Sequence, residues 1–288
     1  MSSAIALWPD MPLGGDKMVP SLTPYLLPGA EPRPAVLVIP GGGYSMVCES
    51  TEGRPVAEAF NKLGLHAFVL IYRTAPDRFP APLLDGLRAM KIIRGRAAEW
   101  HVIPDEITAC GFSAGGHLAG SLGFFPEEAD ASCGDAFDDV DPRPNTLLLS
   151  YPVASFEPWS HTVSAENYCG TVTEKEIARF SLEHRVTEKT PPVFLWHTVR
   201  DQMVSYRNST LLAEAMAKAG RPCEFHLFPY GDHGMLTGLD TADVSSWMPL
   251  AMGFLETCRR SRKPDFLECY THAHQVAADK KLRETQEA

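Results

Sequence analysis

The sequence lacks the features that mark several large classes of protein. In its 288 residues, no apolar run approaches the roughly 20 residues that a helix needs to cross a bilayer. The N-terminus, MSSAIALWPDMPLGGDKM, has neither the basic region nor the long apolar region of a secretory signal. We therefore expect a cytoplasmic protein with no membrane partner.

Paired cysteines and excess basic charge are missing too. The seven cysteines are odd in number and widely scattered, and none is spaced as C-x-x-C. This pattern predicts free thiols in a reducing compartment rather than a disulfide framework. The 26 basic residues are outnumbered by 36 acidic ones, which gives a net charge of -10. Because that charge repels phosphate backbones, we expect no nucleic-acid partner.

What is present is a regular alternation of short apolar runs and helix-length segments. The apolar, β-branched runs predict buried strands at 35–40, 66–72, 106–111, 145–152, 192–198 and 223–229. The segments between and after them predict helices at 54–64, 82–100, 114–122, 205–220 and 245–260. Residues 4–9 and 21–29 predict a short antiparallel lead-in at the sheet edge. The alternation predicts an α/β fold, a mostly parallel sheet with helices on both faces.

Two internal segments interrupt this alternation. Residues 124–144 are acidic and loop-like, and we interpret them as a solvated surface loop rather than a cation site. Residues 153–191 are irregular and follow a central strand, which predicts a small cap over the carboxyl ends of the strands, where open α/β folds bind ligands. We expect one domain over residues 1–260 and a tail over 261–288 that is partly helical and is a candidate arm for a homo-oligomer.

A candidate nucleophile lies in the stretch ITACGFSAGGHLAG, at Ser113. About one random chain of this length in ten contains G-x-S-x-G, so the motif alone is weak. Its context strengthens it, because the predicted strand at 106–111 leads into the turn and a predicted helix begins at Ala114. A serine on such a turn is strained and exposed, and glycines at 111 and 115 remove Cβ atoms that would collide with neighbouring chain.

A serine nucleophile needs a histidine base and an acid that orients it. Asp201 follows the predicted strand at 192–198, and His233 follows the one at 223–229. Both lie past the carboxyl ends of late strands and come in the order Ser, acid, His that this fold class uses. The sequence therefore predicts Ser113, Asp201 and His233 as catalytic residues.

Other acids and histidines have simpler interpretations. We expect His117, His197 and His226 to be structural, since they lie in the helix after the serine or within strands. Asp232 is adjacent to its histidine, so its side chain points elsewhere. We interpret Asp240 and Asp243 as capping residues of the last helix.

An oxyanion hole is the third requirement. The N–H of Ala114, directly after the serine, supplies one donor. The run VIPGGGYSM after the first predicted strand supplies others at Gly41 to Gly43. This run lacks both G-x-G-x-x-G spacing and a following G-K-[ST], so a phosphate-binding loop is the weaker interpretation.

These motifs together resemble the α/β-hydrolase superfamily, and within it the carbohydrate-ester esterases of the acetylxylan and feruloyl esterase group. The matching segments, within residues 21–260, are TPYLLPG, PGGGYS, EGRPVAEAFNKLG, AFVLIYR, GFSAGGHLA, TPPVFLWHT with Asp201, and FPYGDHG. The resemblance implies Ser113, Asp201 and His233 as the triad. It also implies Gly42, Gly43 and Ala114 as oxyanion donors, with Tyr44 beside the pocket.

The chain also departs from its relatives. Lipase-like members carry His where this chain has Pro40, and related esterases often carry an acid where it has Arg200. We expect Arg200 to reach the pocket mouth and Trp159, in the cap, to contact substrate. Glu52 is interpreted either as a support of the oxyanion loop or as part of a surface salt bridge.

The sequence thus predicts a serine esterase that removes short acyl groups, acetyl first, from a small-molecule carbohydrate ester. Alternatives are a peptidase or aryl-formamidase on the same fold and a non-catalytic ligand receptor. No metal or organic cofactor is required, and the histidines at 272 and 274 are too short a pattern to indicate a metal site.

Overall fold

The computed structural model describes residues 3–11, 19–238 and 241–262. In this part of the chain one eight-stranded sheet has the order β1-β2-β4-β3-β5-β6-β7-β8. β1 and β2 pair antiparallel, as do β2 and β4, and all other pairs are parallel. The strands are β1 (Ile5–Ala6), β2 (Ser21–Tyr25), β3 (Arg33–Ile39), β4 (His66–Ile71), β5 (Val102–Phe112), β6 (Thr146–Ser150), β7 (Val193–Thr198) and β8 (Cys223–Phe228). The predicted mostly parallel sheet with an antiparallel edge is confirmed.

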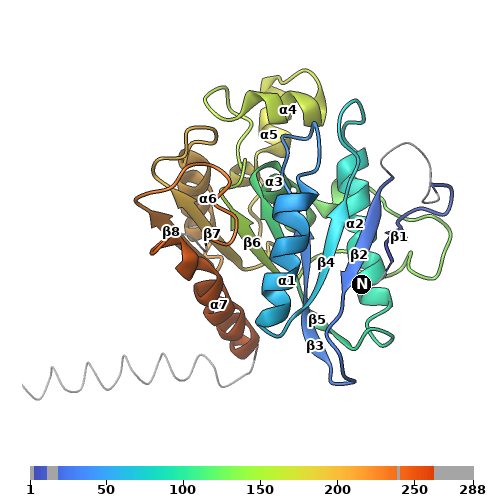
Figure 1. The fold of residues 1–288 in the computed structure, drawn as a ribbon. Helices are drawn as coiled ribbons and strands as arrows, with labels where there is room; N and C mark the ends of the chain where they lie inside the picture. Colours follow the sequence, from blue (N-terminus) through green and yellow to red (C-terminus); the bar gives the residue numbers. More distant parts are fainter. Residues whose placement is uncertain (1–2, 12–18, 239–240, 263–288) are drawn as a thin grey trace, which may run out of the picture. The chain divides into compact units, whose positions relative to one another are not determined.

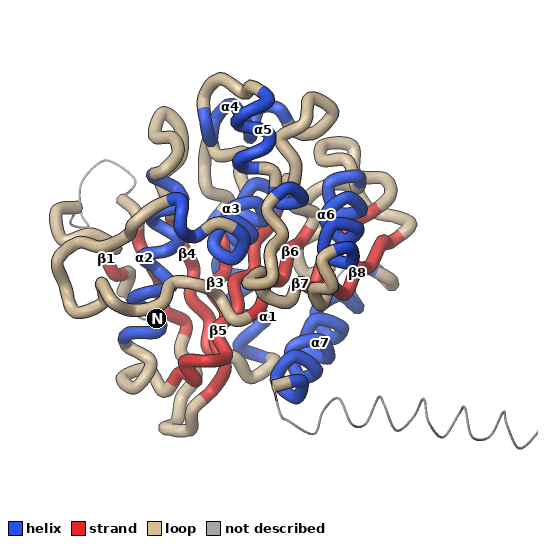
Figure 2. The backbone as a smooth tube through the Cα atoms, turned by 180° about the vertical axis from the view of Figure 1, so that it is seen from behind, coloured by secondary structure: helices blue, strands red, loops and turns tan. Residues whose placement is uncertain are grey.

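Helices cover both faces of the sheet, as Figures 1 and 2 show from opposite sides. α1 (Arg54–Lys62) lies on one face, and α2 (Ala81–Gly95), α3 (Ser113–Phe124) and α6 (Arg207–Lys218) lie on the other. α1 shows how the sequence makes such a helix: Pro55 opens it, and Val56, Ala57 and Phe60 form one buried stripe. Gly64, with φ of +91°, follows its end.

The central strands are buried on both faces, as their uninterrupted apolar sequences predict. Leu37, Ile107, Leu148 and Leu195 each have 0% exposure. Burying one such side chain contributes about 1.5–3 kcal/mol, so the sheet provides a rigid base for the loops that follow its strands.

The order of the strands determines where two of those loops meet. From β3 the chain moves to β4 on one side, and it later returns to β5 on the other side of β3. Ile39 pairs with Gly111 near the carboxyl ends of β3 and β5. Loops on either side of such a switch point diverge and leave a crevice. The glycine loop after β3 and the turn at Ser113 therefore lie side by side.

The insertion after β6 contains α4 (Thr162–Cys169), α5 (Glu174–Phe180) and a short helical turn at Leu182–His184. In Figure 1, α4 and α5 lie at the top, beyond the end of the sheet at which the parallel strands finish. The predicted cap is thus present, and it is more helical than its sequence indicated.

The backbone separates into two compact units, residues 1–248 and 249–288. The boundary falls inside α7 (Trp247–Ser261). The residues of α7 from 249 onward are the regular structure described in the second unit. The predicted division at residue 260 and the oligomerisation role of the tail stay predictions, and the predicted tail helix lies outside the described residues.

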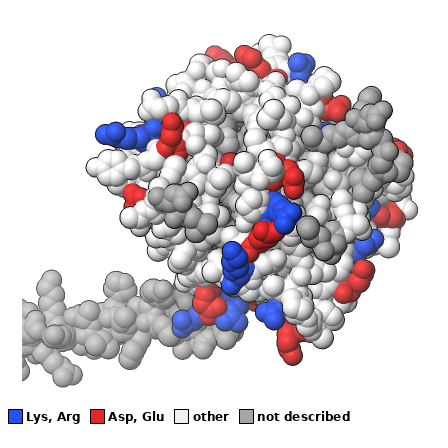
Figure 3. Space-filling model, in the orientation of Figure 1, with Lys and Arg blue, Asp and Glu red and all other residues white. Residues whose placement is uncertain are grey.

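Three chemical expectations can be compared with the described residues. Cys48, Cys110, Cys133, Cys169 and Cys223 are free thiols. No described helix combines the length and the apolarity that crossing a membrane requires. On the face shown in Figure 3, the basic and acidic side chains lie interspersed rather than in one broad basic area. The cytoplasmic location stays a prediction.

Candidate active site

Ser113 occupies the turn between β5 and α3 at the carboxyl end of the sheet. Its φ is +53°, in the left-handed region that non-glycine residues rarely adopt. Two glycines permit this turn. A Cβ on Gly111 would lie 2.1 Å from the oxygen of Gly115, and a Cβ on Gly115 would lie 2.2 Å from the oxygen of Ile39. The G-x-S-x-G spacing therefore reflects close backbone contact on both sides of a strained serine.

His233 and Asp201 approach Ser113 from the loops after β8 and β7. His233 Nε2 lies 2.9 Å from Ser113 Oγ, and His233 Nδ1 lies 2.7 Å from Asp201 Oδ2. With the proton on Nδ1 donated to the carboxylate, Nε2 is free to accept the serine proton. The structure thus brings together the three residues that the sequence singled out.

Asp201 is held as a carboxylate by donors on both oxygens. Oδ1 accepts the N–H groups of Met203 and Val204 at 2.9 and 2.8 Å. Oδ2 lies 3.2 Å from His197 Nε2, in addition to His233. Burial by itself raises the pKa of Asp201, but the hydrogen bonds from His197 and His233 and the attraction of His233 outweigh it, so the pKa lies below its ordinary value. Asp201 is therefore ionised throughout the neutral range.

The glycine loop after β3 lies directly against the serine. A Cβ on Gly41 would be 2.9 Å from the Cβ of Ser113, and a Cβ on Gly42 would be 2.2 Å from the oxygen of Met46. Gly42 and Gly43 have φ of +127° and +64° and border the same cavity as Ser113. Ala114 lies in the first turn of α3, where backbone N–H groups have no partner within the helix. The loop and the helix start thus lie where an oxyanion hole is required.

A cavity of about 450 Å³ opens over Ser113 and His233. This volume is typical of small-molecule sites. Part of its border is apolar and solvent-facing: Met46, Val163 and Met203 are 57%, 53% and 59% exposed. The site therefore combines the polar side chains of Ser113 and His233 with an apolar rim.

The cap contributes a histidine to this cavity that the sequence analysis missed. His161, just before α4, borders the cavity, and its Nδ1 lies 2.7 Å from Ser164 Oγ. Burial and then repulsion from His233 lower the pKa of His161, although Asp201 opposes the shift. On the same helix, Asn167 donates to the oxygen of Gly43 at 2.8 Å. The only sequence signal for His161 was its place in the cap insertion.

The three residues that the sequence analysis placed at the pocket are not among those that border this cavity, and their contact with substrate stays a prediction. Tyr44 has φ of +56°, and its fully buried hydroxyl lies 2.8 Å from His117 Nδ1. Trp159 lies under the guanidinium of Arg207, 4.3 Å from the ring centre. Arg200 is exposed and lies over the ring of Tyr230, at a separate shallow pocket.

The other histidines and acids have structural partners. His117 Nε2 donates to the oxygen of Phe180 at 2.9 Å, and burial lowers the pKa of His117 to about 4. His226 bonds to Glu224. Asp232 accepts the N–H of Gln202 and of His233 itself. Asp243 accepts the N–H of Val244, as a capping residue does. Asp240 and the histidines at 272 and 274 lie outside the described residues.

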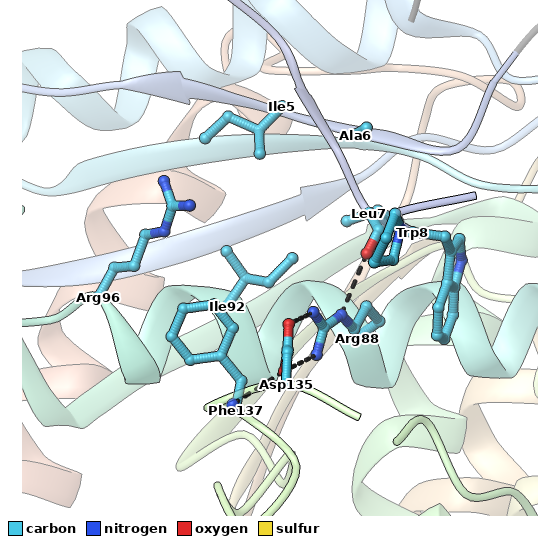
Figure 4. Close-up of a pocket in the computed structure, with 10 residues that line it drawn as sticks. Ile5, Ala6, Leu7, Trp8, Arg88, Ile92, Arg96, Asp135 and Phe137 are labelled. Atoms are coloured by element: carbon cyan, nitrogen blue, oxygen red, sulfur yellow. Dashed lines mark hydrogen bonds and ion pairs between the residues drawn. The ribbon is translucent and has the colours of Figure 1, made fainter. Parts of the chain in front are cut away.

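A second cavity, of about 420 Å³, lies between β1, α2 and the acidic loop (Figure 4). The buried guanidinium of Arg88 donates to the oxygen of Leu7 and pairs with Asp135. Asp135 also lies close to Cys133 and Asp138. Because Arg88 already neutralises Asp135 and Asp138 accepts backbone N–H groups, these polar groups serve to hold the loop.

The fold and this site define a class of protein. A serine on a strained strand-to-helix turn, followed in the chain by an acid and a histidine after later strands, is the arrangement of α/β-hydrolases. The glycine loop beside the serine is part of the same arrangement. The class is that of the α/β-hydrolases.

Comparison with known proteins gives the family. The model of the BD-FAE family matches residues 25–216, and the chain belongs to this family. It is 37% identical over 228 residues to endo-1,4-beta-xylanase B of Butyrivibrio fibrisolvens, covering 77% of this chain and 35% of that one. It is 32% identical over 206 residues to an acetylxylan esterase of Xylanibacter ruminicola, covering 69% and 40%. The chain thus spans less than half the length of these two relatives.

Solved structures are similar over most of the chain. An acetyl ester-xyloside bifunctional hydrolase from Caldicellulosiruptor lactoaceticus has a TM-score of 0.82 at 38% identity, covering 89% of this chain and 96% of that one. A thermophilic esterase from Thermogutta terrifontis, solved with propionate, has a TM-score of 0.72 at 26% identity, covering 88% and 93%. His233 lies beyond the segment that the family model matches, so its assignment depends on the geometry at Ser113.

Proposed function

We propose that the protein is a serine esterase that hydrolyses short acyl esters, acetyl esters first, of carbohydrates such as acetylated xylo-oligosaccharides. The observation that carries this proposal is the hydrogen-bonded chain from Ser113 Oγ through His233 to Asp201, with distances of 2.9 and 2.7 Å, at a cavity of about 450 Å³. That chain is the arrangement needed to make a serine hydroxyl nucleophilic.

Acylation begins when Ser113 Oγ attacks the ester carbonyl carbon while His233 Nε2 takes the hydroxyl proton. The carbonyl oxygen becomes an oxyanion, which the N–H groups of Gly42, Gly43 and Ala114 stabilise. One such donor contributes roughly 3 kcal/mol. His233 then gives its proton to the leaving alcohol oxygen as the carbon–oxygen bond breaks, and the acyl group remains on Ser113.

Deacylation repeats these steps with water as the nucleophile. His233 Nε2 takes a proton from water, which attacks the acyl carbon. The same N–H groups stabilise the second oxyanion, and His233 returns the proton to Ser113 Oγ as the carboxylic acid leaves. Asp201 keeps its charge throughout and holds the imidazole with its proton on Nδ1.

The proposed substrate class has two supports. One similar protein is named an acetylxylan esterase, and another an acetyl ester-xyloside bifunctional hydrolase. In addition, a cavity of about 450 Å³ with an open rim suits a short acyl group on a sugar that extends outward.

Substrate profiling tests the proposal. We expect acetate release from acetylated xylo-oligosaccharides, and a decline from p-nitrophenyl acetate to p-nitrophenyl octanoate. Faster cleavage of acyl anilides or N-formyl arylamines than of acetyl esters would favour a peptidase or an aryl-formamidase. Absence of hydrolysis with every ester would favour a ligand receptor.

A further inference from the structure

Glu52 is a buried carboxylate in the wall of the catalytic cavity that the proposed reaction does not use. It is 6% exposed and borders the cavity together with Ser113 and His233. Among the described residues, no lysine or arginine forms an ion pair with it. A buried carboxylate without a cationic partner costs several kcal/mol unless hydrogen bonds compensate. Its partners therefore indicate what it does.

Each oxygen of Glu52 accepts from a different loop. Oε2 accepts the N–H of Gly41 at 2.6 Å, directly before the two predicted oxyanion donors. Oε1 accepts the hydroxyl proton of Tyr151 at 2.9 Å, in the loop after β6. Glu52 thus ties the glycine loop to the segment that leads into the cap.

Tyr151 extends this connection to the catalytic histidine. Its hydroxyl oxygen accepts the N–H of Leu236 at 3.3 Å, three residues beyond His233. Its ring lies edge-on to the His233 ring, with centroids 4.9 Å apart. Tyr151 has φ of +37°, an unfavourable conformation for a non-glycine residue that is kept where the surrounding structure requires it.

We propose that Glu52 and Tyr151 form a positioning pair that holds the glycine loop and the His233 loop in register and stabilises the protonated His233 of the acylation step. This inference rests on the proposed function. With Gly41 fixed, the following peptide units cannot rotate away from the serine. The negative charge of Glu52 also attracts the imidazolium, which exists only after proton transfer, so the pair acts on kcat more than on KM.

The groups around Glu52 leave its charge as the variable to test. Tyr72, Tyr151, Cys48 and Cys110 all face it, and burial is the first cause that raises the pKa of each. Burial also raises the pKa of Glu52, opposed by the Gly41 N–H, the Tyr151 hydroxyl and then His233. The tyrosines and thiols stay uncharged in the acid and neutral range.

His233 itself faces two further titratable groups. Asp201 is ionised throughout this range because its pKa is lowered, and the pKa of His161 is also lowered, by burial first. Both groups are the same in the wild type and in the Glu52 variant. A shift in the acid limb of the pH–kcat profile when the Glu52 charge is removed therefore reports the attraction between Glu52 and His233.

The test compares Glu52→Gln, Tyr151→Phe and the double variant on p-nitrophenyl acetate from pH 4.5 to 9. The matched control is Glu58→Gln, which removes an exposed acid on α1. We expect Glu52→Gln to lower kcat by about 10- to 100-fold, less than the loss of a direct oxyanion donor, with KM within about threefold. Its acid limb should move to lower pH by about half a unit.

Tyr151→Phe keeps the ring and removes only the hydroxyl, so it tests the idea even if Glu52→Gln fails to fold. We expect a smaller loss of kcat, an acid limb moved in the same direction, and a double variant no worse than about threefold below Glu52→Gln. Lost activity with an unmoved acid limb in either folded variant would overturn the inference. So would a double variant whose loss of kcat equals the product of the two single losses. An inactive wild type would instead refute the proposed function.

Discussion

Replacing Asp201 by Asn removes one charge and almost no volume, and the structure determines how the new side chain must lie. The N–H groups of Met203 and Val204 both point at Oδ1 of Asp201. The amide oxygen must therefore keep that position, which leaves the NH₂ group facing His233 Nδ1. Nδ1 then becomes an acceptor, and the imidazole proton moves to Nε2, opposite Ser113 Oγ. In that tautomer His233 cannot take the serine proton.

The expected loss is large, because the tautomer and the charge that stabilises the imidazolium are both lost. We expect kcat to fall by about 10³- to 10⁴-fold, which corresponds to about 4–5.5 kcal/mol of transition-state stabilisation. Steady-state kinetics on p-nitrophenyl acetate near pH 7.5 measure it. The matched control, Asp232→Asn, makes the same change one residue from His233 and should stay within about threefold. An Asp201→Asn variant that keeps more than a tenth of wild-type kcat would refute the assignment.

Three further predictions concern the turn, the core and the cap. Gly115→Ala places a methyl group 2.2 Å from the oxygen of Ile39, so we expect at least 100-fold lower activity on p-nitrophenyl acetate or failure to fold. The control Gly253→Ala, with nothing within 4 Å of the new atom, should leave that activity unchanged. Burial lowers the pKa of His117 to about 4, so between that pH and about 6.5 the unfolded chain holds a proton that the folded chain lacks. Urea titrations should therefore show the free energy of unfolding falling by about 2 kcal/mol from pH 6.5 to 5. A His117→Gln variant with the same pH dependence as the wild type would contradict this. His161 borders the cavity in the cap, so we expect its ring to form one hydrogen bond to the sugar. His161→Ala should then lower kcat/KM about tenfold for acetylated xylo-oligosaccharides and little for p-nitrophenyl acetate; equal losses on both substrates would exclude this role.

The sequence predicted the fold closely because the sheet is buried on both faces. Uninterrupted apolar runs such as VFLWHT and NTLLLS are typical of parallel strands that are covered on both faces. The positions of Ser113, Asp201 and His233 followed from the same logic. All parallel strands end at one edge, so residues just past late strands come near the serine without any knowledge of packing.

The cavity wall could not be predicted, because it depends on backbone angles and on non-local packing. Tyr44 follows three glycines, and its sequence position does not reveal that its ring is buried and its hydroxyl contacts His117. His161 borders the cavity because of the course of the backbone in the cap, and the cap sequence has no strand periodicity from which that course could be predicted. Glu52 was left between two interpretations, and its bonds to Gly41 and Tyr151 connect it to the glycine loop rather than to a surface ion pair.

The central claim is that Ser113 carries the acyl group during hydrolysis of carbohydrate acetyl esters. Acetate release from acetylated xylo-oligosaccharides, measured side by side for the wild type and Ser113→Ala, tests it most directly. The account predicts steady release by the wild type and at least 10⁴-fold slower release by a folded Ser113→Ala variant. Release by the variant within tenfold of the wild type would contradict it.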